Sequence, residues 1–131
     1  MKKYIAVLSL SIFAFSFLAF TPVNDLDDIK KALKSGDASA LTPFIGDNVE
    51  IEIDGDVDYY SKDKAIAKLK AFFATNKVSG FTQAHQGSTK DNSAQFLIGH
   101  LGSKAGKYRV YLLMRVKGDR FSIQEMNFSK E

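Results

Sequence analysis

The segment 107–116 alternates strictly between two kinds of side chain. One set of alternate positions is almost wholly apolar and the other is mixed: Tyr108, Val110, Leu112, Met114 and Val116 against Lys107, Arg109, Tyr111, Leu113 and Arg115. A period of two is typical of a β-strand with one buried face, because successive side chains of a strand point to opposite sides. The chain must therefore build a sheet and cover one face of it.

Two neighbouring segments extend this interpretation. Residues 49–54 alternate in the same way, and we expect Val49, Ile51 and Ile53 to face inward and Glu50, Glu52 and Asp54 outward. Gly55 marks a turn, after which 58–60 can pair back as a short strand. From Gly80 to Glu131, apolar runs separated by turn signals predict an antiparallel meander of four strands, with a bulge near Gln124 and Glu125.

Helical spacing occurs in two places. Apolar residues recur every three or four positions from Asn24 until Gly36, and again from Lys62 to about Asn76. A short helix beginning with Asp37 as its N-cap is expected between them. Two helices, a strand pair, a long helix and a meander predict an α+β fold, with helices on one side of the sheet. No linker interrupts 24–131, so we expect a single domain there.

The first twenty residues differ from the rest. Lys2 and Lys3 precede an apolar run from Tyr4 to Phe20, which is the pattern of a secretory signal peptide. We predict a signal peptide over 1–20, cleaved between residues 16 and 21. An uncleaved membrane anchor or a buried helix of the fold is the alternative for this run. Both a cleaved signal and an uncleaved anchor predict that the body of the protein is exported, to the periplasm or out of the cell.

Removing the signal changes the charge balance. The chain has 18 Lys and Arg and 15 Asp and Glu, so the loss of Lys2 and Lys3 leaves 16 against 15. A nearly neutral body gives no reason to expect nucleic acid or, once the signal is cleaved, a membrane as partner. The absence of cysteine excludes disulfides, cysteine-ligated metals and attachment of a lipid to cysteine, so the exported protein is not expected to be a lipoprotein.

Several segments resemble the nuclear transport factor 2-like (NTF2-like, cystatin-like) superfamily, and more closely a domain-of-unknown-function family of small exported bacterial proteins. They are 29–37, 48–53, Tyr60-Ser61-Lys62 with the helix ending at Phe72-Phe73, His85-Gln86-Gly87 and 108–111. The resemblance implies a cone-shaped α+β fold, in which helices pack in the concave side of a curved antiparallel sheet. It carries no activity, because the family has none assigned.

Histidine chemistry is the basis of one functional hypothesis. The resemblance implies that an enzyme of this fold would hold an acid–base group inside the cone, and His85 and His100 are the only imidazoles. Either, paired with a carboxylate, could serve proton transfer of the isomerase or dehydratase kind. No metal-ligand spacing such as HExxH is present, and Asp54, Asp56 and Asp58 lack the spacing of a calcium loop, so we expect no metal and no cofactor.

A non-enzymatic binding module is the preferred hypothesis. Tyrosine combines apolar area with a polar tip and arginine offers a planar fork for a carboxylate, so the candidate ligand-binding residues are Tyr60, Tyr108, Arg109 and Tyr111. The ligand is a small molecule or a protein. Proteins of the superfamily commonly dimerise through the sheet, and we expect a homodimer if Leu97, Leu101, Tyr111 and Leu113 lie at exposed alternate positions.

Overall fold

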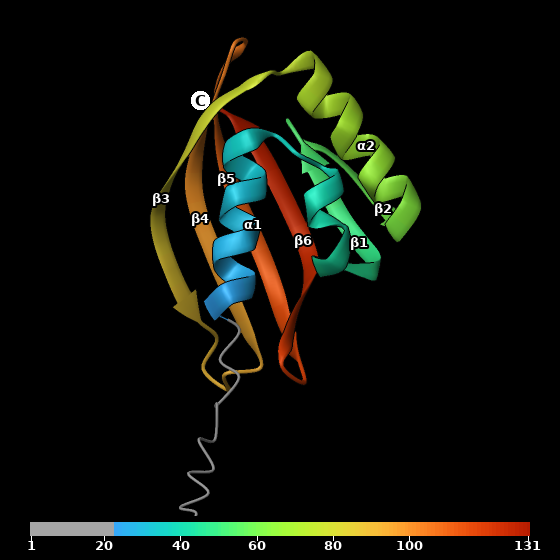
Figure 1. Cartoon of the computed structure of the whole chain (residues 1–131), viewed down its shortest axis with the longest axis vertical. Helices are drawn as coiled ribbons and strands as arrows, with labels where there is room; N and C mark the ends of the chain where they lie inside the picture. The colour runs from blue at the N-terminus through green and yellow to red at the C-terminus, as the bar shows by residue number, and fades with distance from the viewer. Residues whose placement is uncertain (1–22) are drawn as a thin grey trace, which may run out of the picture.

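The computed structural model describes residues 23–131. The predicted signal peptide, which ends at Phe20, and its cleavage site lie outside the described residues. Along the chain the elements are α1 (Val23–Ser35), a 3₁₀ helix (Ser39–Phe44), β1 (Ile45–Ile53), β2 (Asp56–Ser61), α2 (Lys62–Thr75), β3 (Val78–Ser88), β4 (Ala94–Ser103), β5 (Gly106–Lys117) and β6 (Arg120–Lys130). Figure 1 shows both helices on one side of a curved sheet. The predicted α+β fold is confirmed.

The six strands form one sheet in the order β2-β1-β6-β5-β4-β3. The four C-terminal strands are the predicted antiparallel meander, and β2 pairs back antiparallel on β1. One pair departs from the expected antiparallel arrangement, because β1 runs parallel to β6. Strands β1 and β6 lie far apart in sequence and are joined through the intervening elements, so the parallel pairing needs no tight hairpin between them.

Helix α1 lies across the strands of the meander, and α2 covers the end of the sheet formed by β1 and β2 (Figure 1). The first helix ends where predicted, because Gly36 takes the left-handed conformation at φ +64°. In this turn the Asp37 amide donates to the Ala32 carbonyl at 2.9 Å, which closes the end of the helix. The short helix that follows is a 3₁₀ helix, and the Asp37 carboxylate accepts a hydrogen bond from the Ala40 amide.

Two bulges in β3 decide which side chains reach each face. The pairing with β4 shifts between Val78 and Gly80, and again between Gln83 and His85. Each shift inserts one residue without a partner, which changes the phase of the strand. The bulge predicted in the last strand is also present: Leu113 pairs with Glu125 and Met114 with Ile123, which leaves Gln124 unpaired. Within the described residues, no helix is long and apolar enough to cross a membrane.

Candidate functional site

The concave side of the sheet is filled by the hydrophobic core. Phe72 and Phe73 of α2 pack on Phe128 of β6, with ring centroids 4.9 and 6.3 Å away. Among the described residues, no buried side-chain nitrogen or oxygen lacks a hydrogen-bond partner. Side chains of α1, α2 and the sheet thus occupy the space in which a cone-based enzyme would hold its substrate.

Tyr108 belongs to this core rather than to an open site. It is buried, and its ring lies edge-on to Phe72 with centroids 5.2 Å apart. Its hydroxyl donates to the Asn76 side-chain oxygen at 3.2 Å, while the Asn76 side-chain amide donates to the Phe72 carbonyl at the end of α2. Burial, followed by the nearby charge of Asp54, raises the pKa of the Tyr108 hydroxyl. The hydroxyl therefore has a structural partner already.

The four candidate ligand-binding residues are not brought together. Tyr60 pairs with Val49 on the concave side, packed against the core, and Tyr108 lies on the same side. Arg109 and Tyr111 occupy the intervening positions of β5 and face the convex side. The sheet separates the two pairs, so no single ligand contacts all four.

The convex face carries an apolar strip, made of four half-buried side chains on β4 and β5. Ile98 lies directly opposite Tyr111, and Phe96 lies opposite Leu113. Burial raises the pKa of the Tyr111 hydroxyl, and the Glu125 carboxylate adds to the rise. We call Phe96, Ile98, Tyr111 and Leu113 the convex strip.

The expected exposed patch was half wrong. Tyr111 and Leu113 lie on the convex face, but Leu97 and Leu101 are fully buried on the concave face. The register with β5 is the cause, because Leu97 pairs with Leu112 and Leu101 with Tyr108, both of which face the core. Residues directly opposite one another in a sheet share a face.

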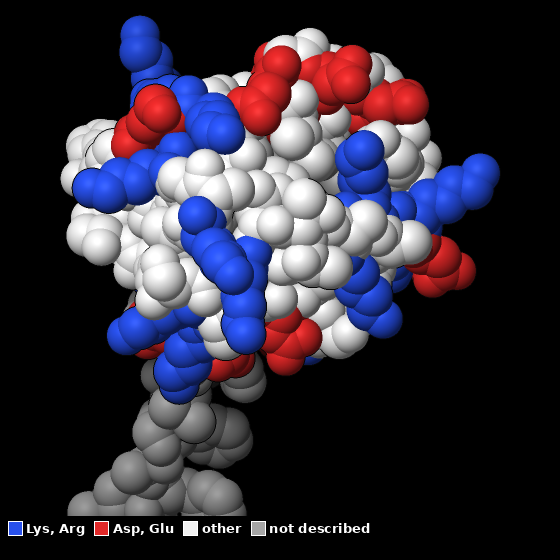
Figure 2. Space-filling view, turned by 90° about the horizontal axis from the view of Figure 1, so that it is seen from above, with Lys and Arg blue, Asp and Glu red and all other residues white. Residues whose placement is uncertain are grey.

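An acidic row borders the convex strip. Glu125 of β6 lies directly opposite Glu50 of β1, and Glu52 follows on the same face of β1. Neither Glu50 nor Glu125 forms an ion pair among residues 23–131. Two like charges directly opposite in a sheet are destabilising, so this row is a place where a cation from another molecule would be favourable. Figure 2 shows that acidic and basic side chains are both spread over the surface, with several acidic side chains close together along one edge.

Both histidines lie outside the cone. His85 is exposed on the convex face beside the strip, with its ring 5.5 Å from that of Phe96. His100 is also exposed, and its Nδ1 lies 2.7 Å from Glu131 Oε1. The carboxylate orients the ring and selects the tautomer with the proton on Nδ1. A histidine–carboxylate pair therefore exists, but on the convex face and not in an enclosed cavity.

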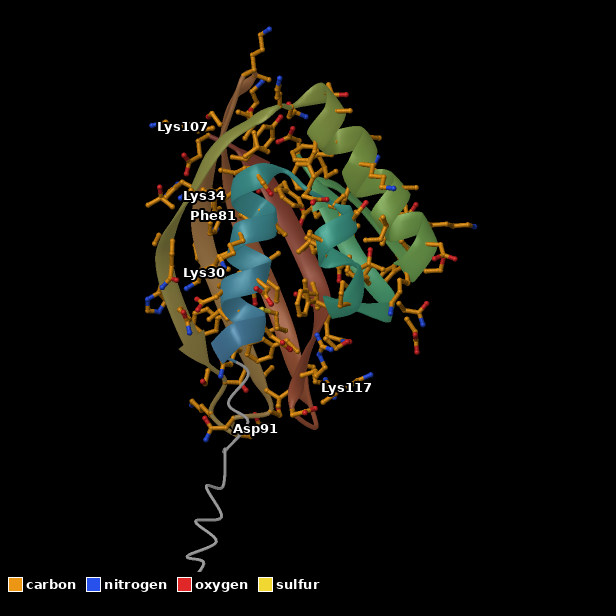
Figure 3. All side chains as sticks on the ribbon, viewed as in Figure 1. Lys30, Lys34, Phe81, Asp91, Lys107 and Lys117 are labelled. Carbon is orange, nitrogen blue, oxygen red and sulfur yellow. The ribbon has the colours of Figure 1, made fainter. Side chains whose placement is uncertain are left out.

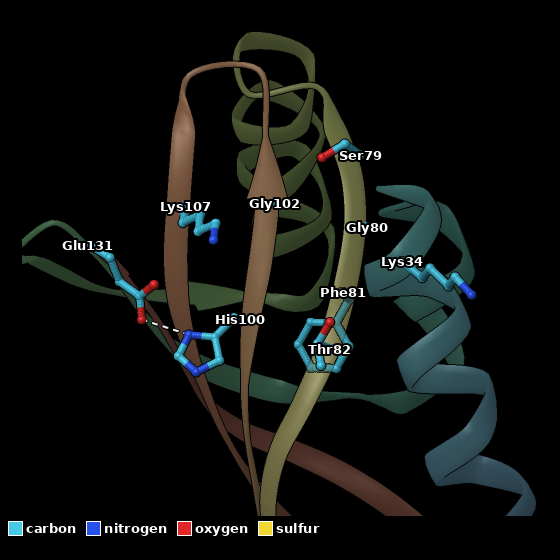
Figure 4. A pocket seen from close by; sticks show the side chains of 9 residues that line it. All are labelled: Lys34, Ser79, Gly80, Phe81, Thr82, His100, Gly102, Lys107 and Glu131. Carbon is cyan, nitrogen blue, oxygen red and sulfur yellow. Dashed lines mark hydrogen bonds and ion pairs between the residues drawn. The ribbon is translucent and has the colours of Figure 1, made fainter.

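This pair borders a hollow of about 710 Å³ at one end of the convex face (Figure 4). Its floor is bare because Gly80 and Gly102 face each other there. Neither the hollow nor the contact of Glu131 with His100 could be expected from the sequence. The bulge at Ser79 and the cross-strand glycine pair arise only from the register, so alternation in a single strand could not have indicated them.

Comparisons with known proteins agree with this geometry. Residues 26–129 match the family described as "Domain of unknown function (DUF4783)". A crystal structure of a DUF4783 family protein from Bacteroides ovatus is 31% identical, covers 79% of this chain and 93% of that chain, and has a TM-score of 0.76. One from Bacteroides fragilis is 28% identical, covers 79% and 96%, and has a TM-score of 0.75.

The fold is shared more widely than the sequence. An NTF2-like protein from Cytophaga hutchinsonii is 9% identical, covers 82% of this chain and 93% of that chain, and has a TM-score of 0.62. At this identity the likeness concerns the fold alone. None of the curated proteins matches the chain. The matched family model spans nearly all of the described residues, and the chain belongs to the DUF4783 family of domains of unknown function, with an NTF2-like fold.

Proposed function

We propose that this protein is an exported, non-enzymatic binding module whose convex sheet face docks another protein, and that a second copy of the chain is the first such partner. The observation that carries the proposal is the convex strip. Four large apolar side chains lie adjacent on a sheet face that no element of the described chain covers. Such a patch bordered by polar residues is typical of a protein-interaction surface.

The charges around the strip support a second copy as the occupant. In a symmetric dimer the same surface serves both partners, so a useful patch must be complementary to itself. Arg109 and Arg115 flank the strip on β5, while Glu50 and Glu125 lie on the neighbouring strands. A second copy supplies apolar area for the strip and arginines for the two carboxylates, which lack ion pairs within their own described chain.

Light scattering on the chain from residue 21 onward tests this proposal. We expect a dimer at tens of micromolar. Ile98→Glu should convert it to a monomer with unchanged circular dichroism, because the strip then carries a buried charge at its centre. Ala67→Glu is the matched control, since Ala67 is exposed on α2, on the opposite side of the sheet from the strip. A wild-type monomer at this concentration, or equal effects of both variants, would overturn the dimer.

Export is a separate part of the proposal, and it rests on the sequence. The charged start and apolar run of residues 2–20 support a signal peptide whose removal leaves a periplasmic or secreted domain without a lipid anchor. Intact-mass measurement of protein recovered from the producing cells should show a chain beginning between residues 16 and 22. Retention of Met1 would contradict cleavage.

The acid–base alternative finds less support. The concave side is packed with apolar side chains, and the His100–Glu131 pair lies on an exposed surface where water is not excluded. Proton-transfer enzymes rely on enclosed groups whose surroundings adjust their pKa. We therefore assign the pair a binding role.

A further inference from the structure

The hollow at the end of the convex face is built by two special backbone features. Gly80 and Gly102 pair across β3 and β4 without side chains, and Ser79 is the extra residue of the bulge beside them. The bulge turns the Ser79 hydroxyl over Gly102, where a Cβ would lie only 2.8 Å from Oγ. An alanine at Gly102 would therefore occupy the floor of the hollow.

Four side chains place hydrogen-bond donors around this floor. In the register, Lys107 lies opposite Gly102, and Thr82 lies opposite His100. Figure 4 shows the Lys107 side chain extending toward Gly102 from β5 and the Ser79 hydroxyl pointing toward Gly102 from β3, on the opposite side. Cross-strand neighbours on one face lie about 5 Å apart at Cβ, so these groups can converge on one small ligand.

The charges of the hollow favour an anion. Of its two lysines, Lys107 extends over the floor, whereas Lys34 comes from α1 on the other side of β3 and points away from it; Glu131 is the one carboxylate among the lining residues. Glu131 is already engaged by His100, which leaves the Nε2 atom of the ring free. This atom can accept from a protonated oxygen of the ligand or, once protonated, donate to an anionic oxygen.

The arrangement of donors selects among anions. A planar carboxylate is held best by the two parallel donors of an arginine fork. The residues lining this hollow instead offer single donors from different directions: two hydroxyls, an ammonium and an imidazole. Several separate donors around a bare floor suit a tetrahedral group with three free oxygens.

We propose that this hollow binds the phosphoryl group of a phosphate-bearing molecule. Ser79 and Thr82 donate through their hydroxyls, Lys107 supplies the charge, and Glu131 holds His100 in place. This site goes beyond the proposed docking of a second copy and does not depend on it, because none of its donors belongs to the convex strip. A soluble phosphate ester and a lipid headgroup share this chemistry.

Amide chemical shifts of the ¹⁵N-labelled full-length chain, kept in nonionic detergent, test the proposal. Inorganic phosphate, added at constant ionic strength, should shift the Gly80, Thr82 and Gly102 amides in a saturable way. Lys107→Gln should weaken binding at least about tenfold, since a hydrogen bond to a charged group contributes more than a neutral one. Ser79→Ala removes one neutral donor and should weaken binding less.

Lys117 provides the matched control. Lys107 and Lys117 lie at opposite ends of β5 (Figure 3), so Lys117→Gln removes the same charge from the same strand, away from the hollow. This variant should bind phosphate as the wild type does. Equal weakening by both variants, acetate binding as tightly as phosphate, or shifts that do not saturate would each overturn the proposal. Gly102→Ala, with folding checked by circular dichroism, should abolish the shifts by filling the floor.

The source of the phosphoryl group is distinguished by two further probes. Phosphoserine should compete with inorganic phosphate if the natural ligand is a soluble ester. Vesicles containing phosphatidic acid, whose headgroup is a phosphate monoester with three free oxygens, should sediment with the wild type, but not with Lys107→Gln, if it is a lipid. Failure of both probes, with inorganic phosphate itself not binding, would leave the dimer proposal standing, since that rests on the strip alone.

Discussion

The two faces of the sheet use the same strands for opposite purposes. On β5, Leu112 is fully buried under the helices, whereas its neighbour Leu113 is half-buried on the convex face. The concave face is covered by α1 and α2 and has no unsatisfied polar atom among the described residues. The convex face has an apolar strip, a hollow and an acidic row that forms no ion pair within residues 23–131. Because the helices fill the concave side, the convex side is the face of the sheet that stays open.

Adjacent leucines of β5 offer the largest expected difference. Leu112→Ala should lower the free energy of unfolding by about 2–5 kcal/mol, because it removes buried methyl groups and leaves a cavity. Leu113→Ala should cost about 1 kcal/mol or less in the monomer, since water can fill the space. Urea denaturation of both variants at low protein concentration measures the pair. Equal losses would mean that the convex face is packed as tightly as the core.

The two tyrosines of β5 allow the same comparison of the two faces, with a smaller expected difference in stability. Tyr108→Phe removes the donor to Asn76 and should cost about 1–2 kcal/mol, because a buried oxygen loses its partner. Tyr111→Phe should change monomer stability little, since it keeps the ring on the convex face. Thermal unfolding of the two variants measures the difference. A larger loss of stability for Tyr111→Phe than for Tyr108→Phe would mean that the Tyr111 hydroxyl stabilises the fold and would contradict the expectation.

The turn between β3 and β4 should show the smallest effect and belongs to neither face. The Asp91 carboxylate accepts hydrogen bonds from the Ser93 hydroxyl at 2.7 Å, the Ser93 amide at 3.1 Å and the Thr89 hydroxyl at 2.8 Å. These bonds lower the pKa of Asp91 from 3.8 to about 2. The folded state thus favours the charged form of Asp91. The contribution of this charge to the free energy of unfolding is therefore complete above pH 3.8 and is lost as the pH falls through about 2.

Melting temperatures between pH 6 and about pH 1.5, compared for the wild type and Asp91→Asn, measure this contribution, because this range extends beyond both the unfolded-state pKa of 3.8 and the folded-state pKa of about 2. The variant should melt lower near neutral pH, and the two curves should converge at the acid end. Parallel curves over the whole range would show that the Asp91 charge does not contribute to stability.

Most of the fold could be predicted from alternation and turn signals. The strand at 49–54, the long helix from Lys62 and the meander after Gly80 all follow from local spacing. Each is present, although the first strand runs from Ile45 to Ile53 and leaves Asp54 in the turn. The parallel pairing of β1 with β6 could not be predicted, because partners far apart in sequence leave no local pattern. The bulges at Ser79 and between Gln83 and His85 were missed for the same reason.

Candidate residues were predicted less well than elements. His100 was singled out as a possible partner of a carboxylate, and it does pair with Glu131, 31 positions away in the sequence. Its place on the convex face, however, depends on β4 lying between β3 and β5. Tyr108 and Tyr111 were grouped by residue type, yet the odd spacing between them places them on opposite sides of the sheet.

The sequence by itself determined the order of the strands and helices, with one apolar face on β5, because local periodicity and turn residues act within a few positions. Only the tertiary structure decided which face of β4 is buried and which groups meet around Gly80 and Gly102. A strand with apolar residues on both faces has no preferred side until its neighbours set the register. The surface left open for binding is a consequence of that register.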